Sequence, residues 1–164
     1  MTKCLRSAVA LFMLLAQPTF GAGADAAGAS SSAHFSVGMS EQRPTTMKIR
    51  FTANGKAVTA TLINNAASRD FRSLLPLTLT LEDYAATEKI AYLPRKLSTA
   101  DAPPGFDPSV GDVTYYAPWG NLAIFHKNAP YAKGLVQLGR IDSDLDVLAA
   151  RGRVPVTIEL VVQP

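Results

Sequence analysis

The sequence predicts a mainly β domain: a closed eight-stranded antiparallel barrel with two short capping helices. Three observations support this fold class. Several short segments alternate apolar and polar residues, which is typical of strands with one buried face. An Asn-Gly pair joins the first two segments and favours a two-residue hairpin turn. No long helical segment separates the strands, so we expect antiparallel neighbours, and eight of them can close around a core of side chains.

The first 45 residues have a different character from the predicted barrel, which we assign to residues 46–163. Lys3 and Arg6 precede a short apolar stretch and a small-residue ending, a pattern that predicts a secretory signal peptide over residues 1–24. The apolar stretch is shorter than the roughly 20 residues of a spanning helix, so the mature chain should hold no integral membrane segment. Residues 25–45, rich in Ala, Gly and Ser, predict a flexible tether. We therefore expect a periplasmic or secreted protein.

The first hairpin is the clearest local prediction. Its arms, residues 47–53 and 56–62, both alternate, and they flank Asn54-Gly55. A type I′ turn needs positive φ at both central residues, which Asn and Gly tolerate. Closing the hairpin there gives one apolar and one polar face. The predicted apolar pairs are Met47 with Leu62, Ile49 with Ala60, and Phe51 with Val58.

The next elements are shorter. Asn65 is a suitable N-cap for a short helix that Pro76 ends. Alternation predicts strands at 77–81 and 89–93. Prolines and a glycine exclude regular structure from residues 98–110, which we interpret as a surface loop.

The last third of the chain completes the count. Three strands are predicted at 113–117, 122–126 and 135–141. Asp142 or Ser143 should cap a second helix, with Arg151 in its last turn and Gly152 just past its end. The final strand, 156–160, alternates again.

Composition excludes several function classes. The formal net charge is +3, of which two units belong to the predicted signal, so there is no electrostatic footprint for nucleic acid. One Cys and two His supply neither a zinc site nor a nucleophile with its base, and we expect no metal and no cofactor. Residues 142–146 begin like a calcium loop, but Val147 and Arg153 stand where that loop needs Gly and Glu. A helix-capping role is the favoured interpretation of this acidic cluster.

Aromatic residues concentrate around a Pro-Trp-Gly-Asn turn, and their role has two interpretations. They could be barrel core, yet in an alternating strand one of Tyr115 and Tyr116 must face outward, where it would suit an apolar ligand or a proline ring. From the barrel topology we also expect Glu88 and Arg95 to lie near these aromatic residues, at the same open end of the barrel. The candidate ligand-binding residues are Tyr92, Tyr115, Tyr116, Trp119, Asn121 and Phe125.

Two long runs, residues 111–125 and 134–141, resemble the bacterial cyclophilin-like family, whose members often have no assigned function. The resemblance covers about residues 47–162 and implies a cyclophilin barrel. True cyclophilins are peptidyl-prolyl isomerases with an apolar groove and an arginine that eases amide rotation, and the resemblance places Phe125 near that groove. Leu135 and Pro130 stand where a cyclophilin would carry a histidine and a tryptophan.

Three functions follow from this comparison of patterns. The first is a binding domain that takes a peptide segment or a small apolar ligand at the aromatic patch. The second is a divergent peptidyl-prolyl isomerase in which Arg95 or Arg140 replaces the usual arginine. The third is a structural or interaction module that uses the Pro-rich loop, residues 98–110.

Overall fold

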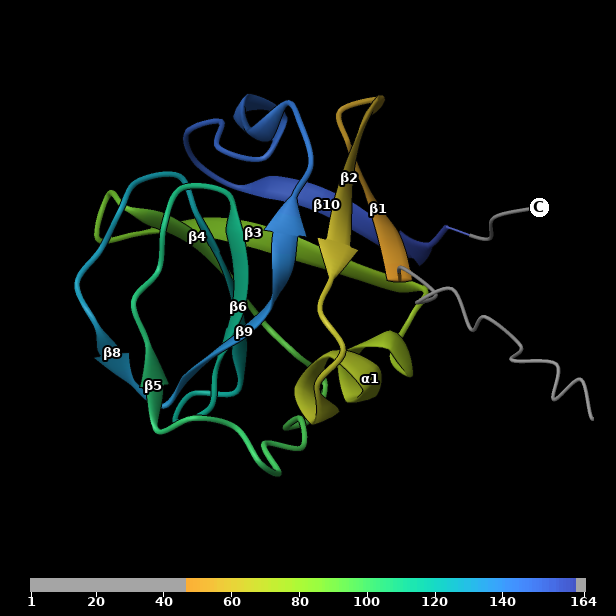
Figure 1. Ribbon diagram of the computed structural model, residues 1–164. Coiled ribbons are helices and arrows are strands. Elements are labelled where there is room, and N and C mark those ends of the chain that lie inside the picture. The colour runs from red at the N-terminus through yellow and green to blue at the C-terminus, as the bar shows by residue number, and fades with distance from the viewer. Residues whose placement is uncertain (1–46, 162–164) are drawn as a thin grey trace, which may run out of the picture. The chain divides into compact units, whose positions relative to one another are not determined.

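The computed structural model describes residues 47–161, which form an antiparallel barrel (Figure 1). Eight strands close in the order β1-β10-β3-β4-β7-β6-β9-β2. A separate two-stranded sheet pairs β5 with β8. The strand bounds are β1 Met47–Ala53, β2 Lys56–Leu62, β3 Leu77–Tyr84, β4 Glu88–Tyr92, β5 Gly105–Phe106, β6 Asp112–Tyr116, β7 Asn121–Phe125, β8 Ala132–Lys133, β9 Leu135–Ile141 and β10 Val154–Leu160.

The predicted eight-stranded barrel is confirmed, and so is the register of its first hairpin. Phe51 lies opposite Val58, and Met47 lies opposite Leu62, with Asn54 and Gly55 both at positive φ in the turn. The expected signal peptide, residues 1–24, and the expected tether, residues 25–45, lie outside the described residues. Among residues 47–161, no helix is both long and apolar enough to cross a membrane.

The main core fills the barrel interior. Alternate residues of each strand point inward, so that Ile49 and Phe51 of β1 meet Ile158 of β10 in a fully enclosed cluster. Burial of this apolar surface is the main stabilising contribution, since about 25 cal/mol is gained for each Å² removed from water. The rigid wall that results is what can hold outward-facing side chains in place.

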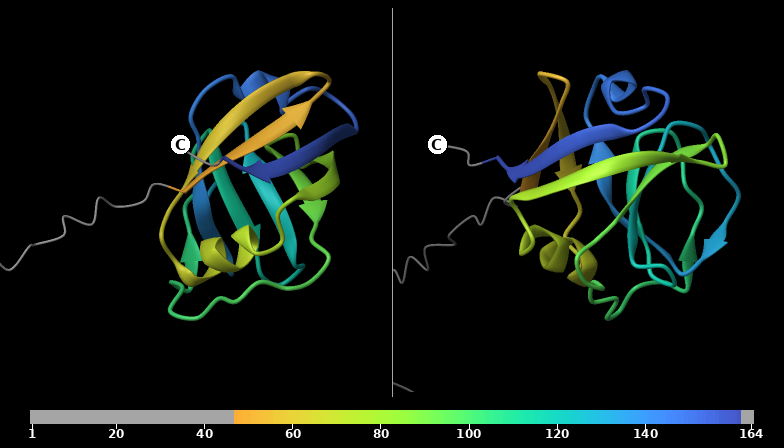
Figure 2. Two further views of the ribbon diagram at one scale, coloured as in Figure 1. Left: turned by 90° about the vertical axis from the view of Figure 1, so that its right-hand side faces the viewer. Right: turned by 180° about the vertical axis from the view of Figure 1, so that it is seen from behind.

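Helix α1, Ala66–Arg72, covers one end of the barrel (Figure 2). The side chain of Asn65 caps it as predicted, accepting a 2.7 Å hydrogen bond from the Ser68 amide. The Ser68 hydroxyl donates to the Leu138 carbonyl of β9, and Phe71 is fully buried in the main core. The helix is therefore fixed to the barrel by both polar and apolar contacts.

The prediction of a second capping helix was wrong. The segment forms only a three-residue 3₁₀ turn, η1, Leu145–Val147, at the barrel end opposite α1 (Figure 1). Asp142 is not free to cap a helix, because its carboxylate pairs with Lys48 and accepts from the Thr61 hydroxyl. Asp144 adopts a left-handed conformation and makes no side-chain capping bond. These contacts hold the start of the segment to β1 and β2.

Residues 98–110 are not wholly irregular, contrary to the prediction. Gly105 and Phe106 form β5, which pairs with β8 outside the barrel. The backbone comes very close at this point, since a Cβ on Gly105 would lie 2.5 Å from the Ala132 carbonyl oxygen and from the Tyr131 hydroxyl. Only glycine permits that approach. The small sheet lies against the barrel's outer surface and frames the site described next.

Candidate binding pocket on the outer barrel face

A second, smaller apolar cluster lies on the outside of the barrel. Ala123 and Phe125 of β7 and Leu135 of β9 point outward yet are almost fully buried. Phe106 of β5 and Ala132 of β8 pack on them and shield them from water. The β5–β8 sheet therefore converts one outer face of the barrel into a partly covered surface.

Cross-strand register determines which side chains meet on this face. Tyr116 of β6 lies opposite Asn121 of β7 and also opposite Leu135 of β9. Glu88 of β4 lies opposite Phe125 of β7 and Tyr84 of β3. Residues paired in this way project to the same side of a sheet. Five strands thus contribute neighbouring side chains to one area.

These side chains line a pocket of about 290 Å³. Tyr116, Asn121 and Phe125 come from the barrel wall, while Pro130 and Tyr131 come from the segment that precedes β8. Small-molecule pockets are mostly apolar clefts with a few placed polar groups, and this pocket is near the lower end of their usual size range. Its remaining apolar walls include Pro108, Ala129 and Ala132.

Trp119 lies between two tyrosines at the pocket. Its ring centroid is 5.4 Å from those of Tyr84 and Tyr116, with interplanar angles of 89° and 80°. Edge-to-face packing of this kind stabilises aromatic pairs by about 0.5–1.5 kcal/mol beyond burial. Gly120 ends the Trp119 turn at a φ of +74°, which favours glycine. Trp119 nevertheless remains 46% exposed, and Tyr131, on the rim, 58%.

Among the polar side chains of this lining, Glu88 and Asn121 are distinctive. Burial raises the pKa of the half-buried Glu88 carboxyl above its ordinary value. Asn121 is 1% exposed, and its Oδ1 accepts no hydrogen bond from any described residue. An unpartnered buried acceptor is uncommon, because leaving one costs about 1–3 kcal/mol.

The structure brings four of the six predicted site residues together: Tyr116, Trp119, Asn121 and Phe125 all line the pocket. Tyr115 does not, because it faces the barrel interior, where its hydroxyl accepts a 3.1 Å hydrogen bond from the Leu97 amide. Tyr92 lies outside the lining and is 62% exposed.

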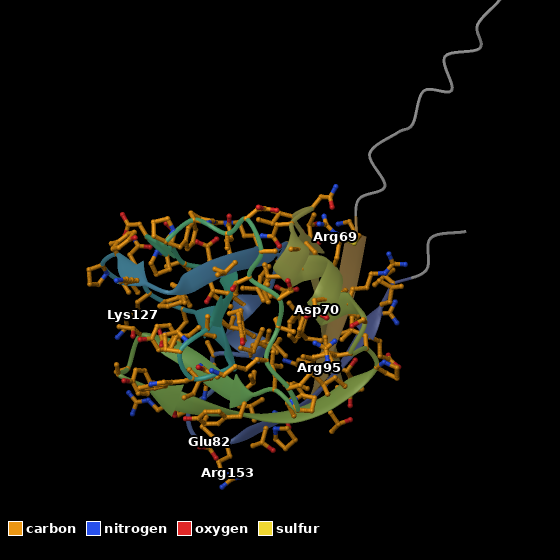
Figure 3. The ribbon with its side chains drawn as sticks, turned by 90° about the horizontal axis from the view of Figure 1, so that it is seen from below. Arg69, Asp70, Glu82, Arg95, Lys127 and Arg153 are labelled. Atoms are coloured by element: carbon orange, nitrogen blue, oxygen red, sulfur yellow. The ribbon has the colours of Figure 1, made fainter. Side chains whose placement is uncertain are left out.

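Two other residues were expected near the aromatic residues: Glu88 lines the pocket, and Arg95 does not. Arg95 instead forms a two-pronged ion pair with Asp70 of α1, with nitrogen–oxygen distances of 2.6 and 2.9 Å (Figure 3). Arg140 is also engaged elsewhere, 3.0 Å from Asp112 and 2.7 Å from the Val110 carbonyl. Neither arginine is at Phe125.

Sequence reasoning missed Tyr84 and Tyr131. Strand β3 runs on to Tyr84, but the alternation of apolar and polar residues stops at Leu81, so no local pattern indicated Tyr84. Tyr131 lies in the connection before β8, and only the long-range pairing of β8 with β5 brings it to the pocket. No local pattern indicates such a pairing.

A model of the cyclophilin-like family matches residues 51–159, which span nearly all of the barrel and the whole pocket. The chain belongs to the cyclophilin-like family. This cyclophilin-like protein is similar to a solved structure, the solution structure of a hypothetical protein from Archaeoglobus fulgidus, with a TM-score of 0.52 and 17% sequence identity. The match covers 73% of this chain and 98% of the archaeal one. No curated protein matches the chain.

The comparisons therefore establish the barrel, while any chemistry must come from the pocket itself. Within residues 47–161 of this cyclophilin-like chain, no three His, Cys, Asp or Glu side chains are grouped to hold a metal ion. What the lining does offer is aromatic surface, one carboxyl group and one unpartnered amide oxygen. That set is suited to holding a ligand.

Proposed function

We propose that the protein is a binding domain that holds a small apolar ligand or a short peptide segment in the outer-face pocket. The aromatic-lined pocket on a rigid barrel wall is the observation that carries this proposal. Tyr and Trp rings give a large apolar contact area at little cost in conformational entropy. The pocket's volume fits a small molecule or one or two side chains of a peptide.

We further propose that the protein is exported and acts in the periplasm or outside the cell. The support is the basic start, apolar stretch and small-residue ending over residues 1–24. Amino-terminal sequencing of the protein recovered from a periplasmic fraction tests this. A chain that begins close to residue 25 is expected, and a chain in that fraction that still begins at Met1 would contradict cleavage.

In this proposal the pocket binds without isomerising. Amide rotation needs a donor placed opposite the apolar wall that holds the proline. No arginine is among the described residues that line the pocket, and Arg95 and Arg140 are both committed to ion pairs. We expect no acceleration of prolyl isomerisation by folded protein; acceleration that Phe125→Ala abolishes would replace this proposal with an isomerase.

Trp119 is the only tryptophan in the sequence, so its fluorescence reports directly on the pocket. We would titrate the protein with a proline-containing tetrapeptide and with cyclohexanol, a small neutral apolar ligand. At least one should change the emission saturably. Tyr131→Ala should weaken that binding, because it removes an aromatic wall.

Tyr92→Ala is the matched control, since Tyr92 is similarly exposed but lies outside the pocket. Its binding curve should equal that of the unchanged protein. Equal weakening by both variants would contradict a binding role for this pocket, and no saturable change with either ligand would exclude these two compounds as its ligands.

A further inference from the structure

The pocket's charges and rings define a narrower ligand class than its apolar character alone. We propose that the pocket takes an organic ammonium ion, primary or methylated, carried on a small apolar body. This inference rests on the proposed function of the same pocket, and it names the chemical class of the ligand. Three independent features of the lining support it.

The first feature is charge. Glu88 is the only Asp, Glu, Lys, Arg or His among the described residues that line the pocket. The neighbouring hollow contains His126, Lys127 and Arg151 together with Asp83, and none of these four lines the pocket of Glu88. A half-buried carboxylate with no basic partner in its own pocket disfavours an anionic ligand and is compensated by a cationic one. Charge complementarity therefore selects a cation over a neutral or an acidic ligand.

The second feature is the arrangement of the rings. Trp119 is nearly perpendicular to both Tyr84 and Tyr116, so these rings present surfaces in different directions instead of forming one flat stack. Tyr131, from the segment that precedes β8, adds a further aromatic wall. The negative faces of such rings attract ammonium ions, and walls of this kind recognise quaternary ammonium groups. Glu88 then supplies the net charge that the rings lack.

The third feature is Asn121. Its Oδ1 is a buried acceptor without a donor among the described residues, although its side chain belongs to the pocket wall. Its amide nitrogen has only a long 3.4 Å contact with the Leu122 carbonyl, so the side chain is weakly held. A small rotation would let the oxygen accept from an ammonium N–H or interact with the positive charge of a methylated one. An anionic ligand would gain nothing from this oxygen.

The test compares a cation with a neutral analogue of the same shape. We would titrate the full chain by calorimetry with choline and with dimethylbutanol, in which carbon replaces the ammonium nitrogen. Both have nearly the same shape, so the difference in affinity measures the charge. Choline should bind about ten-fold more tightly, the size expected for a partly desolvated cation on aromatic faces. Butylammonium, which carries N–H donors, distinguishes a primary from a methylated preference, and either preference supports the proposal.

Glu88→Gln keeps the size and shape of the side chain and removes its charge. It should reduce the preference for choline over dimethylbutanol at least several-fold. Glu82→Gln is the matched control, because Glu82 lies on the neighbouring β3 and pairs with Arg153 outside the pocket (Figure 3). It should leave the preference unchanged.

Some results would overturn this inference. Equal affinity for choline and dimethylbutanol would do so, as would a preference for choline that Glu88→Gln leaves unchanged. Binding of cyclohexanol or the proline-containing tetrapeptide without binding of either ammonium ion would also overturn it, while leaving the proposed function in place. Absence of binding by all five compounds would refute both this inference and the proposed function.

Discussion

Replacing Asp70 by asparagine should destabilise the protein at neutral pH and much less so in acid. Asp70 of α1 accepts two hydrogen bonds from Arg95 and a third, at 2.7 Å, from the Ser98 amide. It thereby ties the helix to the segment that leaves β4. An asparagine has the same shape but no charge, so it weakens all three contacts without opening a cavity.

The magnitude follows from the pKa of Asp70. The Arg95 guanidinium, and after it the Ser98 amide, lower this pKa from 3.8 to about 2. Each pKa unit corresponds to 1.36 kcal/mol, so the upper limit is roughly 2.5 kcal/mol. The side chains of Asp70 and Arg95 are 22% and 47% exposed, and solvent screening reduces the effect to about 1–1.5 kcal/mol.

The pH dependence has a defined sign. Because the pKa is lower in the folded state, the stabilisation is fully present above about pH 4 and is lost as the pH falls through 2. The difference in unfolding free energy between the two proteins should fall to about half of its neutral value near pH 3. Urea unfolding followed by circular dichroism between pH 7 and pH 3 measures it.

Asp107→Asn provides the control, since Asp107 is exposed and forms no ion pair with any residue from 47 to 161. It should change the unfolding free energy by less than about 0.5 kcal/mol. A loss in Asp70→Asn that is constant with pH, or no larger than that of the control, would refute the reasoning.

Three further predictions concern the barrel and the pocket. In urea unfolding, Asp83→Ala should destabilise the protein more than Lys89→Met does. The alanine variant leaves the buried Lys89 ammonium without its ion-pair partner, whereas the methionine variant removes that charge. A larger loss of stability in Lys89→Met would contradict this explanation. Gly139→Ala should lower the free energy of unfolding by about 3 kcal/mol in the same measurement, because the added Cβ would collide with the Thr61 carbonyl where β9 meets β2. A loss below about 1 kcal/mol would show that the two strands move apart easily to admit the methyl group. Asn121→Leu should leave the midpoint of thermal unfolding unchanged or raise it, since it removes an unpartnered buried acceptor. The same variant should weaken ligand binding. A clearly lower midpoint would mean that Asn121 supports the fold.

The β-hairpins and barrel strands could be predicted because their signals are local. Asn54-Gly55 determines the turn, and alternation on both arms then determines which residues face the core. The same alternation indicated that one of Tyr115 and Tyr116 must point outward, and in the structure Tyr116 does so. Local chemistry is sufficient where the partner strand is the next one in the chain.

The predictions that were wrong, and the missed site residue Tyr131, have a common physical cause: contacts between residues far apart in the sequence. The carboxylate of Asp142 is bound by Lys48 and Thr61, residues more than 80 positions away in sequence, so its helix-capping pattern was misleading. Likewise β5 and β8 are strands of two residues whose pairing depends on the barrel between them. Tyr131 reaches the pocket only through that pairing. Such positions cannot be read from periodicity in a single segment.

The most direct test of the binding account is to map amide chemical shifts of the protein during a titration with choline. If the pocket is the binding site, saturable shifts should concentrate at the facing parts of β4 and β7, at the Trp119 turn and at the segment that carries Tyr131. The indole N–H of Trp119 should shift with the same dissociation constant. Shifts that concentrate around α1 and η1, at the barrel ends, with the pocket unchanged, would contradict the claim that this face is the binding site.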